Sequence, residues 1–581
     1  MFLLLILALT ALCAAASEYH ERLLLRPLPQ NALLASFNFR SNSSQQSFDQ
    51  QNFRYFPRSL GQILQHAHTK ELHLRFSLGR WDAEVWGARP WHGAREGGNG
   101  VELWAWVEAE SDDEANARWS TLTNALSGLF CASLNFIDST RTIRPVMSFE
   151  PEGTHANASL QLLHGTLPHE VVCTENLTPF VKLLPCKGKA GISSLLDGHK
   201  LFDASWQAMA IDIRPVCENG ECVLEIEQTV DMVLDLDRSK RPRADNPIPR
   251  PLPTEDLECD TSKPYHAEDS CYPLDKGTEP GWSLEQVFGR AIKGSCPLST
   301  EWWGDEMMAG GKTVCINVDP ERTVDVRSAK PYGEVKEGHM RCYQLPDGTD
   351  FDLELHEEVI PPIPLDQPPL HAARAITGYG QERGGVESVF TNPSLTETLE
   401  IVYLESLPWY MKPYIHTLKA RLSPAAALDP IKETYYRPAS DRHRGTHLEL
   451  LLTIPPASTL TLSYDFEKAI LRYTEYPPDP NRGFDVAAAV VRLVSGGRPE
   501  YLRTTTLLLP LPTPDFSMPY NVIILTSTVM ALGFGSIFNL LVRRLVAADE
   551  VPPTPLVLAL ARVRGRVGAA LRGLLRKGKK E

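Results

Sequence analysis

Two kinds of hydrophobic pattern alternate in the first part of the chain. In residues 71–79 and 101–110, apolar and polar residues alternate, which is typical of strands with one buried face. Residues 115–131 instead place Trp119, Leu122, Leu126 and Phe130 at helical spacing, so these four side chains share one stripe. We therefore predict a domain of mixed α+β type over residues 17–236.

The later part of the chain is richer in strand-like runs. Residues 399–407, 448–454 and 459–467 alternate regularly between turn signals, which favours an antiparallel β-sandwich over residues 371–512. The proline- and charge-rich residues 237–282 predict an insertion or loop. Residues 283–370 then form an extension and a linker.

Two uninterrupted apolar runs predict the membrane topology. Residues 2–12, followed by three small alanines, predict a signal peptide over residues 1–16. Residues 521–542 hold no charge over about 22 residues, enough to cross a bilayer, and Arg543 and Arg544 follow at once. We predict a single-pass type I protein with a mostly β (α+β) lumenal region, one C-terminal transmembrane helix and a basic cytosolic tail at 543–581.

The charges divide along the chain in the same way. The tail has ten Lys or Arg against three Asp or Glu, whereas the whole chain has a net charge of −14. The large domain is therefore acidic, which argues against nucleic-acid binding, and the basic tail suits an anionic membrane surface. Lys577 and Lys579 stand fifth and third from the end, as in a dilysine signal for retrieval to the endoplasmic reticulum (ER). Chance basicity of the tail is the alternative.

Ten of the eleven cysteines follow the signal peptide, and an even number in a secretory compartment favours disulfides. Their spacing lacks the paired CxxC of a zinc site, so we expect neither a metal nor a cofactor. The candidates for intrachain disulfides are Cys131, Cys186, Cys217, Cys222, Cys259, Cys271, Cys296, Cys315 and Cys342. Sequons predict N-glycans at Asn42, Asn157 and Asn176.

Motifs for catalysis are missing from the sequence. No Gly-rich phosphate loop, HExxH or GxSxG motif occurs in a suitable context. His164 and Gly165 resemble the His-Gly pair of a caspase-like dyad, but no nucleophile motif follows, and a surface turn is the simpler interpretation. Asp479 and Asp485 are candidate acids of a lumenal hydrolase, or parts of a rigid proline-rich turn. A single-span adhesion or receptor ectodomain is a further alternative.

Long strings in this sequence resemble the PIG-T family of GPI transamidase subunits. They include FCASLNFIDST, VVCTENLTP, LPWYMKPYIHTL, YTEYPPDPNRGF and LPTPDFSMPYNVI, at residues 130–140, 171–179, 407–418, 473–484 and 511–523. Shorter matching strings stand at residues 182–186, 213–217 and 378–384. The resemblance covers most of the chain from about residue 20 to 545, and strings of this length are specific.

The resemblance implies a non-catalytic scaffold subunit of an ER membrane complex. That complex cleaves a C-terminal signal from precursor proteins and transfers the new carbonyl to a preformed GPI lipid. The implied partners are a caspase-like catalytic subunit, which supplies the nucleophile, and the other subunits. The resemblance also implies an intermolecular disulfide from Cys173, in VVCTENLTP, to the catalytic subunit. An internal Cys173–Cys186 bridge is the alternative.

A proline-rich segment precedes the transmembrane run. Three prolines between residues 512 and 519 restrict the backbone, so residues 513–520 are predicted to form a stiff juxtamembrane strap. Given the resemblance, polar residues here lie where a GPI headgroup would meet the membrane surface. The candidates for GPI contact are Asp515, Ser517, Tyr520 and Asn521. Plain anchoring is the alternative.

Overall fold

The chain forms two units, the first ending at Pro512 and the second running from Thr513 to Glu581. The computed structural model describes residues 18–577 except for 54, 156–158, 219–220, 241–258, 260–277, 280, 300–310, 360–364, 379, 381, 426–427, 478, 495–499, 514–516, 544–545, 548 and 551–552. The predicted signal peptide and most of the predicted insertion at 237–282 lie outside the described residues.

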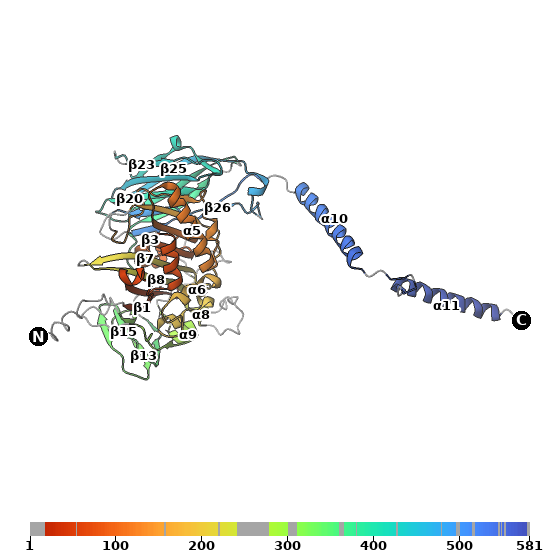
Figure 1. Ribbon diagram of the computed structural model, residues 1–581. Helices are drawn as coiled ribbons and strands as arrows, with labels where there is room; N and C mark the ends of the chain where they lie inside the picture. Colours follow the sequence, from red (N-terminus) through yellow and green to blue (C-terminus); the bar gives the residue numbers. More distant parts are fainter. Residues whose placement is uncertain are drawn as a thin grey trace, which may run out of the picture. The chain divides into compact units, whose positions relative to one another are not determined.

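An eleven-stranded sheet forms the N-terminal part of the first unit (Figure 1). Its strands, in order across the sheet, are β14 (Glu334–Glu337), β15 (Met340–Gln344), β12 (Lys312–Asn317), β1 (Tyr19–Leu28), β2 (Ala32–Ser44), β8 (Glu221–Asp235), β7 (Trp206–Glu218), β3 (Thr69–Gly79), β4 (Gly100–Glu108), β6 (Leu160–Leu167) and β5 (Thr142–Ile143). The predicted strands at 71–79 and 101–110 are confirmed as β3 and β4.

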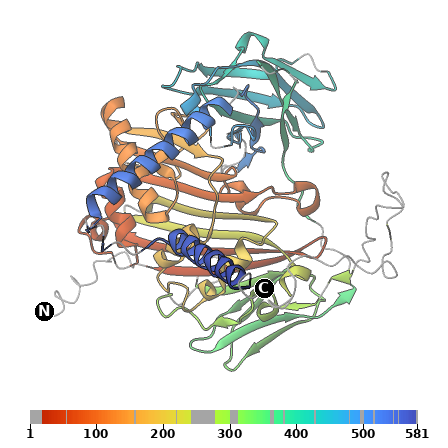
Figure 2. The ribbon, with the colours of Figure 1, turned by 90° about the vertical axis from the view of Figure 1, so that its right-hand side faces the viewer.

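Helices cover one face of this sheet (Figures 1 and 2). The predicted helix is confirmed as α5 (Asp112–Phe130), and all four residues of its predicted stripe are buried. α5 starts where Ser111 Oγ accepts the Glu114 N–H, and it ends at Cys131, which has a left-handed φ of 51°. Helices α3 (Arg58–His66) and α6 (Thr174–Leu183) pack beside α5.

The other helices of the first unit are short. They are α2 (Gln45–Asp49), α4 (Ala83–Trp86), α7 (Gly198–Leu201), α8 (Leu236–Ser239) and α9 (Leu284–Phe288), with 3-10 turns η1 (Pro90–Gly93), η2 (Leu134–Phe136), η3 (Ile192–Leu195), η4 (Ile415–Thr417) and η5 (Tyr473–Glu475). Most of them lie at the ends of strands, so the large sheets determine the architecture.

The opposite face of the eleven-stranded sheet carries buried charges. In β3, the residues Glu71, His73 and Arg75 alternate with apolar residues that join the core under the helices. Asp212 of β7 is fully buried among them. Its Oδ1 lies 2.5 Å from both His73 Nδ1 and Arg75 Nη2, and its Oδ2 lies 3.0 Å from Arg95 Nη1. One carboxylate therefore meets three cationic or protonatable side chains.

Two loops, at residues 80–98 and 145–155, add charges to this network. Arg95, from the first loop, also contacts Glu227 Oε2 of β8 at 2.7 Å. Glu152, from the second loop, contacts Arg214 Nη1 of β7 through its Oε2 at 2.5 Å. The backbone N–H of Glu152 donates to Glu71 Oε1 at 2.8 Å. These bonds attach both loops to the sheet and satisfy the charges that the loops cover.

Residues 283–370, predicted as an extension and linker, complete the main sheet. β12 pairs in parallel with β1, and β15 and β14 extend the sheet beyond it. Cys315 of β12 lies opposite Cys342 of β15, and the two form a disulfide. A separate four-stranded sheet consists of β10 (Trp282–Ser283), β16 (Asp350–Leu355), β11 (Ile292–Lys293) and β13 (Val324–Ser328), and β9 (Thr278–Glu279) pairs with β17 (Glu358–Val359).

Residues 371–512 contain two five-stranded antiparallel sheets, as the sandwich prediction requires. The first sheet contains β18 (His371–Thr377), β19 (Arg383–Thr391), β25 (Thr459–Lys468), β21 (Met411–Pro413) and β22 (Lys419–Ser423). The second contains β23 (Ile431–Arg437), β24 (Thr446–Ile454), β20 (Leu399–Leu407), β27 (Val490–Leu493) and β28 (Glu500–Arg503). A core of leucines and aromatic residues from both sheets joins them, and β26 (Phe484–Val486) pairs with β29 (Leu507–Leu509).

Charged contacts connect the sandwich to the eleven-stranded sheet. Arg503 of β28 is buried, and its Nη2 contacts Glu102 Oε1 of β4 at 3.1 Å. Glu449 of β24 accepts the N–H groups of Val146 and Met147 at 2.6 and 2.8 Å. These bonds have one partner in each part, which explains why all residues up to Pro512 belong to one unit.

Two helices make up most of the described residues of the second unit. α10 (Ser517–Val542) has 26 residues, and its length and apolar composition suit a membrane span, as predicted. It begins four residues before the predicted span, so the end of the predicted strap is helical. Pro519 is compatible with this start, because the first turn of a helix needs no N–H donors. α11 (Pro555–Lys577) forms in the basic tail.

The buried network predicts a defined loss of stability for Asp212→Asn. Burial alone would raise the pKa of Asp212, but Arg75 and Arg95 outweigh burial and hold that pKa well below its usual range. Removing the charge takes the carboxylate partner from the buried Arg75 and one of the acidic partners from Arg95, so we expect a loss of about 3–5 kcal/mol in the free energy of unfolding at pH 7. Urea unfolding of the detergent-solubilised chain, followed by circular dichroism, measures it.

The pH dependence of the same variant has a defined sign. A carboxylate with a lowered pKa stabilises the fold above the pKa of the unfolded chain, and this contribution is lost as the pH falls. The difference between wild type and Asp212→Asn should therefore shrink below about pH 4. Glu321→Gln, at an exposed position, is the matched control and should change the free energy of unfolding little at any pH. Equal effects of the two variants would contradict the role assigned to Asp212.

Candidate functional site

Cys173 lies directly before helix α6, at its N-cap. Asn176, in the first turn, accepts the Cys173 N–H with its Oδ1 at 2.8 Å. This bond satisfies a backbone donor that the helix itself leaves unpaired. Leu177 and Phe180 of the same helix are buried in the core under α5. The backbone at Cys173 is therefore held by a cap and by a buried helix face.

The side chain of Asn176 also ties α6 to α5. Its Nδ2 donates to the carbonyl oxygens of Phe130 and Cys131, at 2.9 and 3.4 Å. Asn176 is only 1% exposed, and an N-glycan would have to be attached through this same nitrogen. The predicted glycan at Asn176 therefore does not fit the folded chain. Asn42 is half-buried on β2, and Asn157 lies outside the described residues.

The disulfides distinguish Cys173 from most other cysteines. The structure pairs Cys186 with Cys296, Cys217 with Cys222 and Cys315 with Cys342. Cys259 is also disulfide-bonded, and Cys271 lies outside the described residues. The alternative Cys173–Cys186 bridge is absent, because Cys186 pairs with Cys296.

Among the described residues, Cys131 and Cys173 have free thiols. Cys131 had been a candidate for an intrachain disulfide, but it lies exposed at the end of α5 and makes none. Cys173 is half-buried. An unpaired thiol on a rigid helix cap is chemically able to form a disulfide with another chain.

Exposed apolar side chains accompany this thiol. Val171 is 76% exposed and Phe136 is 60% exposed. Their segments adjoin, because Glu170 Oε1 accepts the Ser133 N–H at 2.8 Å and Asn176 bonds to Cys131. We call Phe136, Val171 and Cys173 the Cys173 patch. Its apolar members leave no signal in the sequence, since the pattern of a short segment does not show whether a Val or Phe side chain is exposed.

The predicted lipid-contact residues belong to the second unit. Ser517, Tyr520 and Asn521 lie in the first two turns of α10, where Tyr520 is 46% exposed. The residues of α10 after this polar start are mostly apolar, as lipid contact requires. Asp515 lies outside the described residues. Lys577 is the last residue of α11, and Lys579 also lies outside them.

The candidate acids and the His-Gly pair have structural explanations. Asp479 accepts the Asn481 N–H at 3.1 Å, and Asp485 pairs with Arg482 at 2.7 Å, as expected for a capped turn. The surface-turn interpretation of His164 is wrong: this residue is buried on β6 and contacts Glu102 Oε1 at 3.1 Å. Within the described ranges, no group of three His, Cys, Asp or Glu side chains is arranged to hold a metal ion.

Comparison with known proteins identifies the family. The model of the Gpi16 subunit, GPI transamidase component, matches residues 3–567. The GPI transamidase component GPI16 of Saccharomyces cerevisiae is 40% identical over 92% of this chain and 89% of its own length. The chain belongs to the Gpi16 family of GPI transamidase components. The human GPI-anchor transamidase component PIGT is 34% identical to this Gpi16-family chain, over 90% of both.

Family membership confirms the resemblance noted in the sequence. The full-length similarity makes the Gpi16-family chain a GPI transamidase component and does not favour the receptor or hydrolase alternatives. Among solved structures, the collagen-binding subdomain of the Enterococcus faecalis surface protein ACE covers 25% of this chain at 7% identity, with a TM-score of 0.17. That likeness is too weak to inform the function.

The geometry of Asn176 gives a prediction about both stability and glycosylation. Asn176→Ala removes the cap and the bonds to the end of α5, so we expect a loss of about 1–2 kcal/mol in the free energy of unfolding. The mass of the glycoprotein should fall only by the difference between the two side chains. Urea unfolding and intact-mass spectrometry measure the two effects.

Thr178→Ala is the matched control, because it removes the same sequon and keeps every bond of Asn176. Thr178 is exposed, and its hydroxyl donates only to the Thr174 carbonyl within the helix. The control should leave both stability and glycan mass unchanged. Loss of one glycan mass in both variants would show that Asn176 carries a sugar and would contradict the prediction.

Proposed function

We propose that this chain is the non-catalytic scaffold of a GPI transamidase complex and that Cys173 joins it by a disulfide to a caspase-like catalytic subunit. The complex attaches preformed GPI lipids to precursor proteins. The observation that carries the proposal is the Cys173 patch: a free thiol on a capped helix, flanked by exposed apolar side chains. Apolar side chains with this exposure are typical of surfaces that another protein covers.

The contribution of such a scaffold is positional. A precursor protein, a lipid and a protease active site must meet at one height above the membrane. Tethering raises the effective concentration of the reacting groups and orients them, without any nucleophile in the scaffold. The large sheets support this role, because buried ion pairs and shared cores join them into one unit below residue 513.

The proposed location is the ER membrane, with the large unit in the lumen and the basic tail in the cytosol. A single span at α10 and two arginines after it support this orientation. Disulfides among the described cysteines suit an oxidising lumen. Lys577 and Lys579 then act as the retrieval signal, and the remaining sequons at Asn42 and Asn157 as glycan sites.

We further propose that the segment entering α10 contacts the GPI headgroup. Asp515 is the candidate partner for an ethanolamine ammonium, and Ser517, Tyr520 and Asn521 offer hydroxyl and amide groups for sugar or phosphate. Ser517, Tyr520 and Asn521 lie at the start of the apolar helix α10. Polar groups at that position meet the headgroup region of a bilayer rather than its interior.

The disulfide is tested on non-reducing gels. Wild-type complex should give a band containing this chain and the caspase-like subunit, and a reductant should abolish it. Cys173→Ser should remove the band, because no sulfur remains at the helix cap. Cys131→Ser is the matched control, since Cys131 is the other free thiol, and it should keep the band. A band that survives Cys173→Ser but is lost in Cys131→Ser would assign the disulfide to Cys131 and contradict the proposal.

Lipid contact is tested by Asp515→Ala combined with Tyr520→Ala. We expect a several-fold loss of GPI-anchored reporter at the cell surface and accumulation of uncleaved precursor, because each lost charged or polar contact weakens binding by about tenfold. Co-purification should show that the complex still assembles. Met518→Ala, at an exposed apolar position of the same turn, is the control. Normal GPI anchoring of the reporter with an intact complex would contradict lipid contact and would show that the segment serves only to attach the chain to the membrane.

A further inference from the structure

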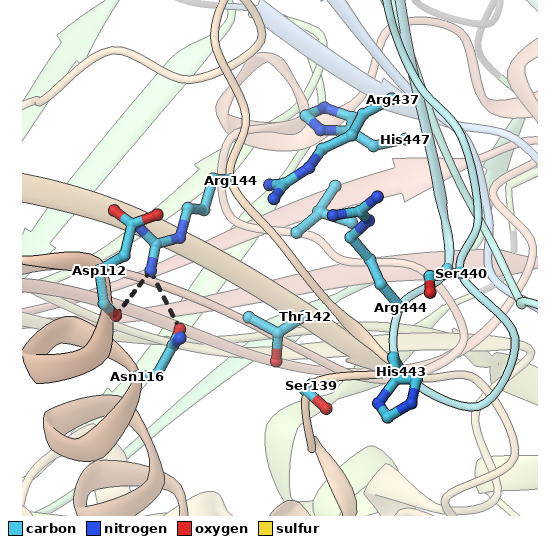
Figure 3. A pocket seen from close by; sticks show the side chains of 12 residues that line it. Asp112, Asn116, Ser139, Thr142, Arg144, Arg437, Ser440, His443, Arg444 and His447 are labelled. Carbon is cyan, nitrogen blue, oxygen red and sulfur yellow. Dashed lines mark hydrogen bonds and ion pairs between the residues drawn. The ribbon is translucent and has the colours of Figure 1, made fainter.

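A second candidate site lies far from Cys173 in the sequence, at the contact between the sandwich and the N-terminal part of the first unit. It is a cavity of about 300 Å³ between the start of α5, β5 and the connection from β23 to β24 (Figure 3). Three arginines line it: Arg144 from one side, and Arg437 and Arg444 from the other. His443 and the hydroxyl-bearing Ser139 and Ser440 complete the polar wall.

Two of the arginines keep unused donors. The half-buried side chain of Arg437 makes no hydrogen bond or ion pair within the described part of the chain. Arg444 donates from Nη2 to the Pro438 carbonyl at 3.1 Å, while its Nε is buried and has no partner among the described residues. Buried polar groups in native proteins normally have partners, so the buried Nε of Arg444 points to a missing acceptor, and Arg437 offers further donors beside it.

The nearby acids are already engaged elsewhere. Asp112 contacts Arg144 Nη1 at 2.6 Å and so neutralises that arginine. Glu449 is satisfied by His447 at 2.7 Å and by the backbone of the 146–148 segment. The lining therefore keeps two arginines whose charges no carboxylate of the lining compensates, although the whole chain has a net charge of −14. In so acidic a chain, two unpaired arginines in one cavity favour an anionic ligand.

We propose that this cavity binds a phosphate group. A guanidinium offers parallel N–H donors that match two oxygens of a phosphate or carboxylate. Arg437 and Arg444 are two such groups on one wall, and with the hydroxyls beside them they supply more donors than the single bidentate pair that a carboxylate forms. A phosphate presents three or four oxygens and uses this arrangement fully. A cavity of about 300 Å³ also admits the short substituent of a phosphate ester.

Two sources share this chemistry: free inorganic phosphate and an ethanolamine-phosphate headgroup. Asp112 lies across the cavity from His443 (Figure 3), and the oxygen of its carboxylate that does not contact Arg144 gives the second source an acceptor for its ammonium. The site is independent of the proposed disulfide, because none of its residues belongs to the Cys173 patch. Failure of one proposal therefore leaves the other standing.

The experiment measures binding of small probes to the detergent-solubilised full chain by phosphorus NMR line broadening. The probes are inorganic phosphate and O-phosphoethanolamine, and acetate competes as the carboxylate comparator. We expect saturable binding of both phosphate probes, and Arg437→Gln should weaken it by about tenfold or more, because a charge-assisted pair is lost. The Arg437 side chain makes no hydrogen bond or ion pair with any residue that the structure describes, so this variant should keep the wild-type melting temperature.

Arg421→Gln is the matched control, since Arg421 is exposed on β22 of the other sandwich sheet and changes the net charge equally. It should alter the affinity by less than about twofold. Tighter binding of O-phosphoethanolamine than of phosphate supports the headgroup source, and equal binding supports free phosphate. The proposal is overturned by non-saturable binding, by equal losses in both variants, or by acetate that displaces phosphate at equal concentration.

Discussion

The carboxylate of Asp212 is the constraint on which the architecture of the N-terminal sheet depends. A sheet with helices on one face usually leaves its other face to water. Here the second face is covered by loops, and its charged side chains are buried. An unpaired buried charge is costly, so each cation must meet an acid of matching geometry. The covering loops therefore occupy the places where Arg95 and Glu152 complete these pairs.

The same principle joins the sandwich to the sheet. Arg503 lies on the edge strand β28, and its guanidinium is buried against Glu102. Burial alone would raise the pKa of Glu102, but Arg503 and His164 outweigh burial and hold that pKa well below its usual range. Phe149 and Tyr501 stack beside this pair, with ring centroids 5.7 Å apart. Ion pairs need defined distances and angles, whereas apolar contacts tolerate sliding. Such a junction suits a subunit whose work is to hold other groups in place.

Much of the secondary structure can be predicted from local patterns of apolar and polar residues in the sequence. The α5 stripe, the alternation in β3 and β4, and the three strand runs of the sandwich all occur where periodicity predicts them. Local periodicity does not report long-range pairing, which is why the sequence predicts only an extension and a linker over residues 283–370, although residues in this range complete the main sheet. The alternation of Glu71, His73 and Arg75 did contain a signal for a second buried face.

The candidate sites divide in a similar way. Cys173 came from a string resemblance, and its geometry as a helix cap is visible only in the structure. Asn176 matches a sequon, but its side-chain nitrogen already donates to the end of α5. A sequence motif does not show that a glycan and these hydrogen bonds would need the same nitrogen. The arginines of the phosphate cavity belong to segments far apart in the chain, at Arg144 and at residues 437–444. Their convergence depends on the junction between two folded parts.

The parallel pairing of β1 with β12 determines the order in which this chain is able to fold. β1 is among the first strands to be synthesised, yet its neighbour follows after β8 and the whole insertion. Until then, β1 has a partner only in β2, and its other edge presents unpaired backbone groups. Long-range strand pairing of this kind slows folding and exposes the chain to aggregation. The emerging chain therefore has an unfinished sheet edge until β12 arrives.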